Sequence, residues 1–132
     1  MPKFSRKSKK ILNTCDERLV ILFDEVVKIV DCKPTCGYRG ESEQNLLFTN
    51  DVSKVVFPFS KHNIYPSQAV DIYPFIKGKG VSFDSRQCYF FAGFVWGIAR
   101  QIGIKIRLGA DWDSDGEVND QTFRDICHFE LV

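Results

Sequence analysis

The stretch from Asp84 to Gly103 constrains the fold most, because it carries apolar residues on two sides of one helix. Asp84 with Gln87 three residues later predicts an N-cap, and Gly103 predicts the C-cap. The main stripe consists of Cys88, Phe91, Ala92, Val95, Ala99 and Ile102, and a second side consists of Phe90, Phe94 and Ile98. A helix that is apolar on two sides is usually central and buried. The chain is therefore expected to fold around a core helix at 84–103.

Two further helices are expected before this one. Thr14 with Glu17 has the form of a capping box, and apolar residues at helical spacing then predict an amphipathic helix over 14–31, which Pro34 ends. A second helix is expected over 41–50. Its inward-facing residues would be Leu46, Leu47 and Phe48.

The remaining chain predicts short strands and loops. Extended segments are expected at 35–39, at 69–73 up to Pro74, at 104–108 and at 129–132, with a turn at 77–80 and a polar loop at 109–120. The apolar stretch 52–59, which Pro58 interrupts, is expected to be a loop that packs beneath the site described below. Few strands and three helices predict an α+β fold, with a small antiparallel sheet packed against about three helices.

The chain length of 132 residues and its composition fit one domain, at 14–132, preceded by a basic N-terminal tail at 1–13. The tail is either a solvated segment or a segment attracted to an anionic surface such as a phosphate-rich envelope polymer. A net charge of +1 argues against a nucleic-acid binder, and no apolar run is long enough to span a membrane. The sequence has no recognisable secretory signal, so the five cysteines are expected to be reduced thiols in a cytoplasm. Structural roles are expected for them, with half a metal site at Cys32-x-x-x-Cys36 and an extra metal ligand at Cys127 as the alternatives.

The chain contains two histidines, His62 and His128, and Asp71 lies in the apolar strand that follows the first. Two neutral imidazoles and one carboxylate are a sufficient protein ligand set for a catalytic zinc ion. The alternatives stay open at this point: both histidines could be ordinary core residues, and Asp71 could pair with Arg or Lys rather than with a cation.

Five short segments in order carry a resemblance over about residues 37–131. They are Gly37-Tyr38-Arg39 with Glu43-Gln44, then Ser60-x-His62, Ala69-Val70-Asp71, Gly109-Ala110-Asp111-Trp112-Asp113, and Asp125-x-x-His128-Phe129-Glu130. The chain resembles the zinc D-Ala-D-Ala carboxypeptidase and L-alanyl-D-glutamate endopeptidase family, which includes phage endolysins. The resemblance implies a hedgehog/DD-peptidase-like fold and a single zinc peptidase domain.

The resemblance also implies residue roles. His62, Asp71 and His128 would hold zinc, Asp125 would be the general base, and Arg39 would polarise the scissile carbonyl. Ser60 matches a residue near the substrate backbone. Trp112, in the polar loop, would contact the substrate or the wall of the site, and Glu130 is either a partner of a ligand histidine or a solvated strand residue.

Two features depart from the family pattern or add to it. The segment between His62 and Asp71 is two residues longer than usual, which puts substrate fit near it in question. The run Asp111–Asp115 begins like an EF-hand loop, but Thr122 replaces the bidentate Glu, so a weak Ca²⁺ site is an open possibility.

The implied function is hydrolysis of peptidoglycan stem peptides at the L-alanyl-D-glutamate bond, by a monomer acting as a phage endolysin. The enzyme would wait in the host cytoplasm for a holin-type permeabilising partner before it reaches the cell wall. Two alternatives are a D-alanyl-D-alanine carboxypeptidase on the same site and a non-enzymatic wall-binding or structural protein with this fold.

Overall fold

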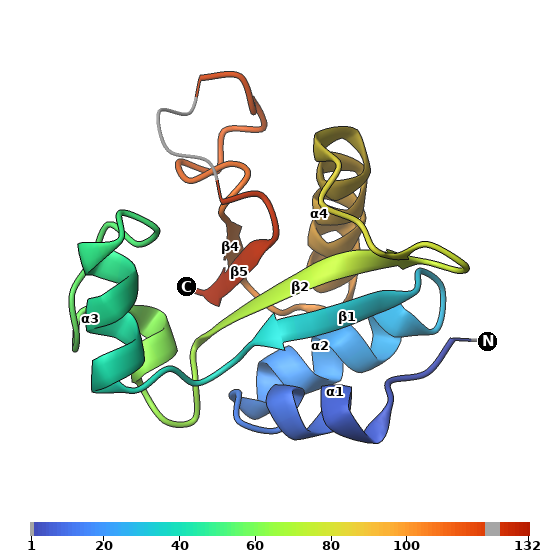
Figure 1. The fold of residues 1–132 in the computed structure, drawn as a ribbon. Coiled ribbons are helices and arrows are strands. Elements are labelled where there is room, and N and C mark those ends of the chain that lie inside the picture. Colours follow the sequence, from blue (N-terminus) through green and yellow to red (C-terminus); the bar gives the residue numbers. More distant parts are fainter. Residues whose placement is uncertain (1, 121–124) are drawn as a thin grey trace.

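The computed structural model describes residues 2–120 and 125–132. In chain order its elements are α1 (Arg6–Leu12), α2 (Glu17–Val27), β1 (Cys32–Cys36), α3 (Glu41–Thr49), the 3-10 helix η1 (Lys61–Asn63), β2 (Ala69–Ile76), β3 (Gly80–Val81), α4 (Ser85–Ile102), β4 (Ile106–Leu108) and β5 (His128–Leu131). Figure 1 shows a small sheet with α1 and α2 below its strands, α4 rising above β2 on the right, and α3 set apart on the left. The predicted α+β class is confirmed.

The sheet is antiparallel and has the strand order β1-β2-β5-β4, with β3 paired to β2. The strand β5 therefore lies between β2 and β4, although it comes last in the sequence. In this register Asp71 of β2 lies directly opposite His128 of β5, and Cys36 of β1 lies opposite Asp71 on the other side. The pairing brings together side chains that are far apart in the chain.

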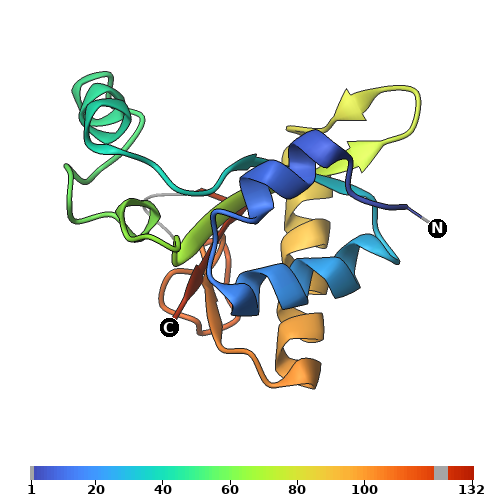
Figure 2. The same ribbon diagram turned by 90° about the horizontal axis from the view of Figure 1, so that it is seen from below.

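Aromatic packing anchors β5 to the helices. Phe129 is fully buried, and its ring lies edge-on to Phe23 of α2 at 5.3 Å and to Phe91 of α4 at 5.9 Å between centroids. In Figure 2, which views the molecule from below, α2 and α4 lie next to each other. Because β5 also carries His128, this packing fixes one edge of the site to the core.

The ends of α4 agree with the prediction. The Asp84 side chain accepts a hydrogen bond from the Gln87 N–H, and Gly103 takes the left-handed C-cap conformation at φ 78°. Its main stripe is buried except for Ile102 at its end, which is 40% exposed, and on the second apolar side Phe90 is 64% exposed. The other two residues of that side, Phe94 and Ile98, are half-buried against the core, so the expectation of full burial is wrong at Phe90 and Ile102.

The first part of the chain differs from its prediction. Thr14 does not cap a helix, because its hydroxyl donates to the Ile11 carbonyl, and α2 begins after Asp16, which accepts from the Arg18 N–H. Residues expected to form a solvated tail contain α1 instead. Its lysines are exposed, whereas Phe4 and Leu12 are buried in the core.

The helix α3 forms near its predicted bounds but does not face inward. Leu46 is 61% and Phe48 45% exposed, and the residue that α3 does bury is the polar Gln44. The apolar stretch 52–59 is likewise exposed, with Phe59 at 75%, so it does not pack beneath the site. Apolar character here marks a surface rather than a core.

The strand β2 continues past Pro74, which was expected to end it. Pro74 lies beyond the residues of β2 that pair with β5, and its carbonyl accepts from the Ser82 N–H. The strand therefore tolerates a residue without an N–H donor at this position. Within the described residues, none of the helices has the length and apolarity needed to cross a membrane.

Candidate metal centre

A capped turn positions His62. The Ser60 hydroxyl accepts a hydrogen bond from the His62 N–H at 3.2 Å, and the Asn63 side-chain oxygen accepts one from the Ser60 N–H at 3.0 Å. The Arg39 N–H donates to the His62 carbonyl at 2.7 Å, which ties the turn to the segment after β1. His62 is 2% exposed, and therefore its ring is held against the sheet rather than in solvent.

Three donor atoms from three elements meet at the sheet. His62 Nε2 lies 3.3 Å from Asp71 Oδ1 and 3.3 Å from His128 Nδ1, and His128 Nδ1 lies 3.1 Å from Asp71 Oδ1. A tetrahedral ion about 2.0–2.1 Å from each ligand atom would place those atoms about 3.3 Å apart. The three side chains thus fit a small tetrahedral cation.

The outer nitrogens of both rings have acceptors of their own. His62 Nδ1 lies 2.7 Å from the Gly37 carbonyl oxygen, and His128 Nε2 lies 2.9 Å from Glu130 Oε1. A carbonyl or carboxylate oxygen only accepts, so each outer nitrogen carries a proton, and the inner nitrogen is the one that can bind a metal ion once its own proton is lost. Ligand histidines in metal sites are oriented in this way. Glu130 is therefore a partner of His128 and not a solvated strand residue.

The charges at this centre are strongly coupled. Burial alone would raise the pKa of Asp71, but hydrogen bonds from His128 and His62 outweigh it and hold the pKa of this carboxyl well below its ordinary value. Burial alone would lower the pKa of each histidine, yet Asp71 raises that of His62 to about 10 and that of His128 to about 9. Without a cation the site therefore holds protons that a metal ion would displace.

Asp125 lies beside the three donors. Its Oδ2 is 3.7 Å from His128 Nδ1, and burial together with the nearby Asp71 carboxylate raises its pKa above the ordinary value. Gly109 fixes this segment: its N–H donates to the His128 carbonyl at 2.8 Å and its carbonyl accepts from the Asp125 N–H at 3.2 Å. A Cβ at Gly109 would lie 1.9 Å from the Asp125 carbonyl oxygen, so only glycine permits this approach.

Arg39 reaches the centre from the opposite side of Asp71. Its Nη2 lies 3.6 Å from Asp71 Oδ2, and its Nη1 donates to Gln44 Oε1 at 2.8 Å. Among the described residues its Nε has no hydrogen-bond partner, although it is buried. Gln44 is itself fully buried and donates to Ser53 and to the Val55 carbonyl, so it fixes the guanidinium.

A cleft of about 810 Å³ opens over the three donors. Besides the donors it is lined by Arg39, Ser60, Trp112 and Asp125, so the structure brings all the predicted site residues to one cavity. The Trp112 ring lies 5.3 Å from the His128 ring and under the Arg107 guanidinium at 5.9 Å, which makes it part of the wall. The facing wall consists of Leu47 of α3 and of Val52, Val55 and Phe59 from the exposed apolar segment that follows it.

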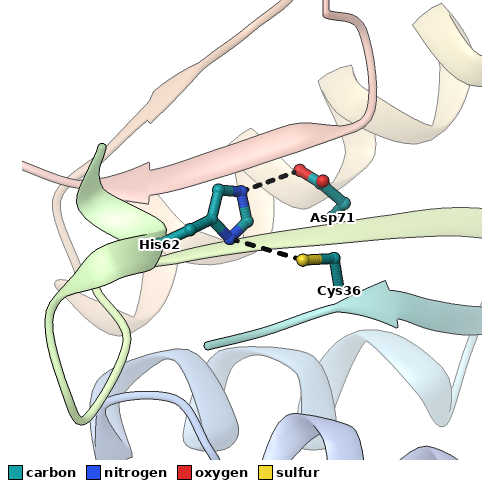
Figure 3. A group of neighbouring side chains, drawn as sticks. All are labelled: Cys36, His62 and Asp71. Carbon is teal, nitrogen blue, oxygen red and sulfur yellow. Dashed lines mark hydrogen bonds and ion pairs between the residues drawn. The ribbon is translucent and has the colours of Figure 1, made fainter. Parts of the chain in front are cut away.

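Cys36 is a neighbour of the centre that the sequence did not indicate. Its sulfur lies 3.9 Å from His62 Nδ1 and 3.6 Å from Arg39 Nη2. Figure 3 shows the His62 ring between Cys36 on one side and Asp71 on the other. These three residues form one possible donor group, and Asp71, Asp125 and His128 form another. The cross-strand pairing of Cys36 with Asp71 places the thiol there, and spacing in the chain does not reveal that pairing.

The acidic loop gathers a third group, Asp111, Asp113 and Asp115. Asp111 is buried, and its carboxylate accepts from the N–H groups of Asp115 at 3.3 Å and Gly116 at 2.8 Å. These bonds order the loop from within. Thr122, at the twelfth position of the EF-hand pattern, lies outside the described residues.

Comparisons with known proteins find relatives over nearly the full length of this chain. A curated L-alanyl-D-glutamate peptidase of Escherichia phage T5 is 30% identical over 142 aligned residues, which cover 98% of each chain. The crystal structure of the Serratia marcescens L-Ala D-Glu endopeptidase ChiX superposes with a TM-score of 0.75 at 22% identity, over 98% of this chain and 89% of that one. The ChiX match shows a shared fold.

The family follows from the whole sequence. A family model described as phage L-alanyl-D-glutamate peptidase matches residues 1–132, and the T5 relative matches over nearly the full length of both chains. The ordered segments at Arg39, His62, Asp71, Trp112 and Asp125–Glu130 meet in one cleft. The chain belongs to the phage L-alanyl-D-glutamate peptidase family.

Proposed function

We propose that this protein is a zinc-dependent endopeptidase that hydrolyses the L-alanyl-D-glutamate bond of peptidoglycan stem peptides, as a phage endolysin. The observation that carries the proposal is the set of three inner donor atoms 3.1–3.3 Å apart, each ring with its outer nitrogen bonded to an oxygen. Family membership and the activity in the T5 relative's name support the reaction class.

His62, Asp71 and His128 would hold the zinc ion, and the Gly37 carbonyl and Glu130 would keep their bonds to the outer ring nitrogens. A zinc ion supplies a Lewis acid that activates a water molecule for attack on the amide. Cys36 lies on the outer face of His62, where the ring nitrogen already faces the Gly37 carbonyl, and is therefore not part of the proposed ligand set.

Asp125 would take the proton of the attacking water and pass it to the leaving amine. Its raised pKa suits this exchange, because a general base works best when its pKa approaches the working pH. The side chain is 39% exposed in the cleft, so a substrate amide can reach it. Arg39, held by Gln44, would stabilise the negative charge that develops on the carbonyl oxygen.

Trp112 and Ser60 would line the part of the cleft that holds the substrate. Trp112 supplies a flat apolar wall beside His128, while Ser60 caps the turn that holds His62 and lines the cleft. A weak calcium site at Asp111–Asp115 stays a prediction, and metal analysis should therefore include calcium. We also propose a monomer that waits in the host cytoplasm for a holin-type partner, on the strength of the phage family alone.

The test combines metal analysis of the purified protein with mass spectrometry of digested peptidoglycan. One equivalent of zinc with new L-alanine carboxyl ends and D-glutamate amino ends is expected. Loss of only the terminal D-alanine would instead identify a carboxypeptidase. Absence of both zinc and products would leave a wall-binding protein. The variant His128→Ala should lose the metal, and stoichiometric zinc in that variant would refute the ligand set.

A further inference from the structure

Two cations share one buried carboxylate at the side of the cleft. Glu130 directs Oε1 to His128, and its Oε2 accepts from Arg107 Nη2 at 2.7 Å and Nε at 3.2 Å and lies 3.3 Å from Lys61 Nζ. Lys61 also donates to the Leu131 carbonyl. Because both cations contact the same oxygen, their nitrogens are close enough for one further carboxylate to bridge them.

The exposure of these groups differs in a way that leaves positive charge at the surface. The Glu130 side chain is 7% exposed, whereas those of Lys61 and Arg107 are 32% and 41% exposed. Two cations against one carboxylate give a local charge of +1, and all three residues line the cleft. An ammonium group donates three hydrogen bonds and a guanidinium five, so both groups can bind an anion without leaving Glu130.

The position of this pair relates it to the residue beside the scissile bond. Glu130 contacts both cations and His128, so one carboxylate links the pair to a residue of the donor set. Lys61 and Arg107 line the same cleft as the donors, so a substrate whose amide lies at the donors can place an adjoining residue beside them. In an L-alanyl-D-glutamyl peptide, one glutamyl carboxyl group continues the chain and the other stays free as an anion.

We propose that Lys61 and Arg107 form the subsite that binds the free carboxylate of the glutamyl residue, on the amine side of the scissile bond. The inference rests on the proposed endopeptidase function and adds the basis of its substrate choice. Glu130 acts as a positioning residue, since it holds both cations and the ligand histidine in one network. A carboxylate bound by two charge-assisted hydrogen bonds is favoured over a neutral group of the same shape.

The test compares two peptides that differ in one group. Acetylated L-alanyl-γ-D-glutamyl-L-lysine carries the free α-carboxylate, and its α-carboxamide is nearly isosteric and neutral. The zinc-loaded wild-type protein is expected to cleave the acid with a kcat/KM about tenfold or more above that of the amide, mainly through KM. Lys61→Met and Arg107→Gln should each bring this ratio towards one, and Lys61→Arg should preserve most of it.

Lys79→Met is the matched control, because Lys79 is exposed in the β2–β3 turn outside the cleft and its removal should leave the ratio unchanged. A general loss of folding would slow both peptides alike and would not move the ratio. Equal cleavage of acid and amide by the wild type, or a full preference retained in both Lys61→Met and Arg107→Gln, would overturn the subsite. If the wild type cleaved neither peptide and left purified peptidoglycan intact, the proposed function would fail and the subsite with it.

Discussion

Replacing Glu130 by Gln tests the network that joins the metal centre to the cationic pair. Glu130 accepts from His128 through one oxygen and from Arg107 through the other, with Lys61 at 3.3 Å. A glutamine has one oxygen and no charge. One donor therefore loses its acceptor, and both cations lose the carboxylate that offsets their charge.

The structure gives the magnitude. Burial alone would raise the pKa of Glu130, but His128 and Arg107 lower it from 4.5 to about 2. At about 1.4 kcal/mol per unit, the ionised carboxylate stabilises the metal-free fold by about 3 kcal/mol at neutral pH. Because the folded-state pKa is depressed, this contribution is complete above pH 4.5 and is lost as the pH falls towards 2. It should still be about 2 kcal/mol near pH 3.5.

Urea denaturation of the metal-free wild type and of Glu130→Gln at pH 7 and pH 3.5 measures this difference. The variant should lose about 3 kcal/mol of unfolding free energy at pH 7 and less at pH 3.5. Glu25→Gln is the control, since Glu25 pairs with Lys28 on the exposed face of α2 and should change stability by less than about 1 kcal/mol. A Glu130→Gln protein as stable as the wild type at pH 7, or one with the same deficit at both pH values, would refute the reasoning.

Three further perturbations address the site itself. Asp125→Asn should keep bound zinc while hydrolysis falls by at least about a hundredfold, as mass spectrometry of digested peptidoglycan would show, and near-normal turnover would remove it from the mechanism. Gly109→Ala should destabilise the fold by about 2 kcal/mol or more and impair zinc binding, because the new Cβ would lie 1.9 Å from the Asp125 carbonyl oxygen. The control is Gly93→Ala, which has open space around it and should be neutral or slightly stabilising in thermal unfolding. The pKa values of His62 and His128, raised to about 10 and about 9, predict that zinc binding at pH 7 releases protons and weakens as the pH falls. The contribution of the two protonated histidines to the stability of the metal-free protein should be complete below pH 6.5 and be lost as the pH rises through 9–10. Calorimetry in buffers of different ionisation enthalpy would measure the release, and an uptake of protons would contradict it.

Local chemistry explains which elements the sequence predicts correctly. The helix α4 begins and ends where Asp84 and Gly103 indicate, because a cap depends on a few neighbouring residues. The inward orientation of Leu46 and Phe48 is wrong because apolarity alone does not show whether a core lies beside a helix. The helix α3 stands apart from the other helices, and its buried polar residue, Gln44, accepts a hydrogen bond from Arg39 rather than packing in a core.

The site is predictable only in part. The candidate site residues, the first Arg39 and the last Glu130, were identified because five short segments resemble a known family in the same order. The structure brings these residues to one cleft. Spacing does not reveal which residues of different strands lie opposite one another, so the proximity of Cys36 to His62 and Asp71 was missed. The close backbone approach of Gly109 to Asp125 was missed for the same reason, although the glycine itself was part of a recognised segment.

The place of β5 in the sheet has a consequence for how the protein is made. While the ribosome is still adding residues, β2 and β4 have emerged without the strand that joins them, because β5 is the last of the three to be synthesised. His128 arrives with that strand, 57 residues after Asp71. The strand that joins β2 to β4 and the last residue of the donor set are therefore added together. A nascent chain that stops before His128 has neither a continuous sheet nor a complete metal centre.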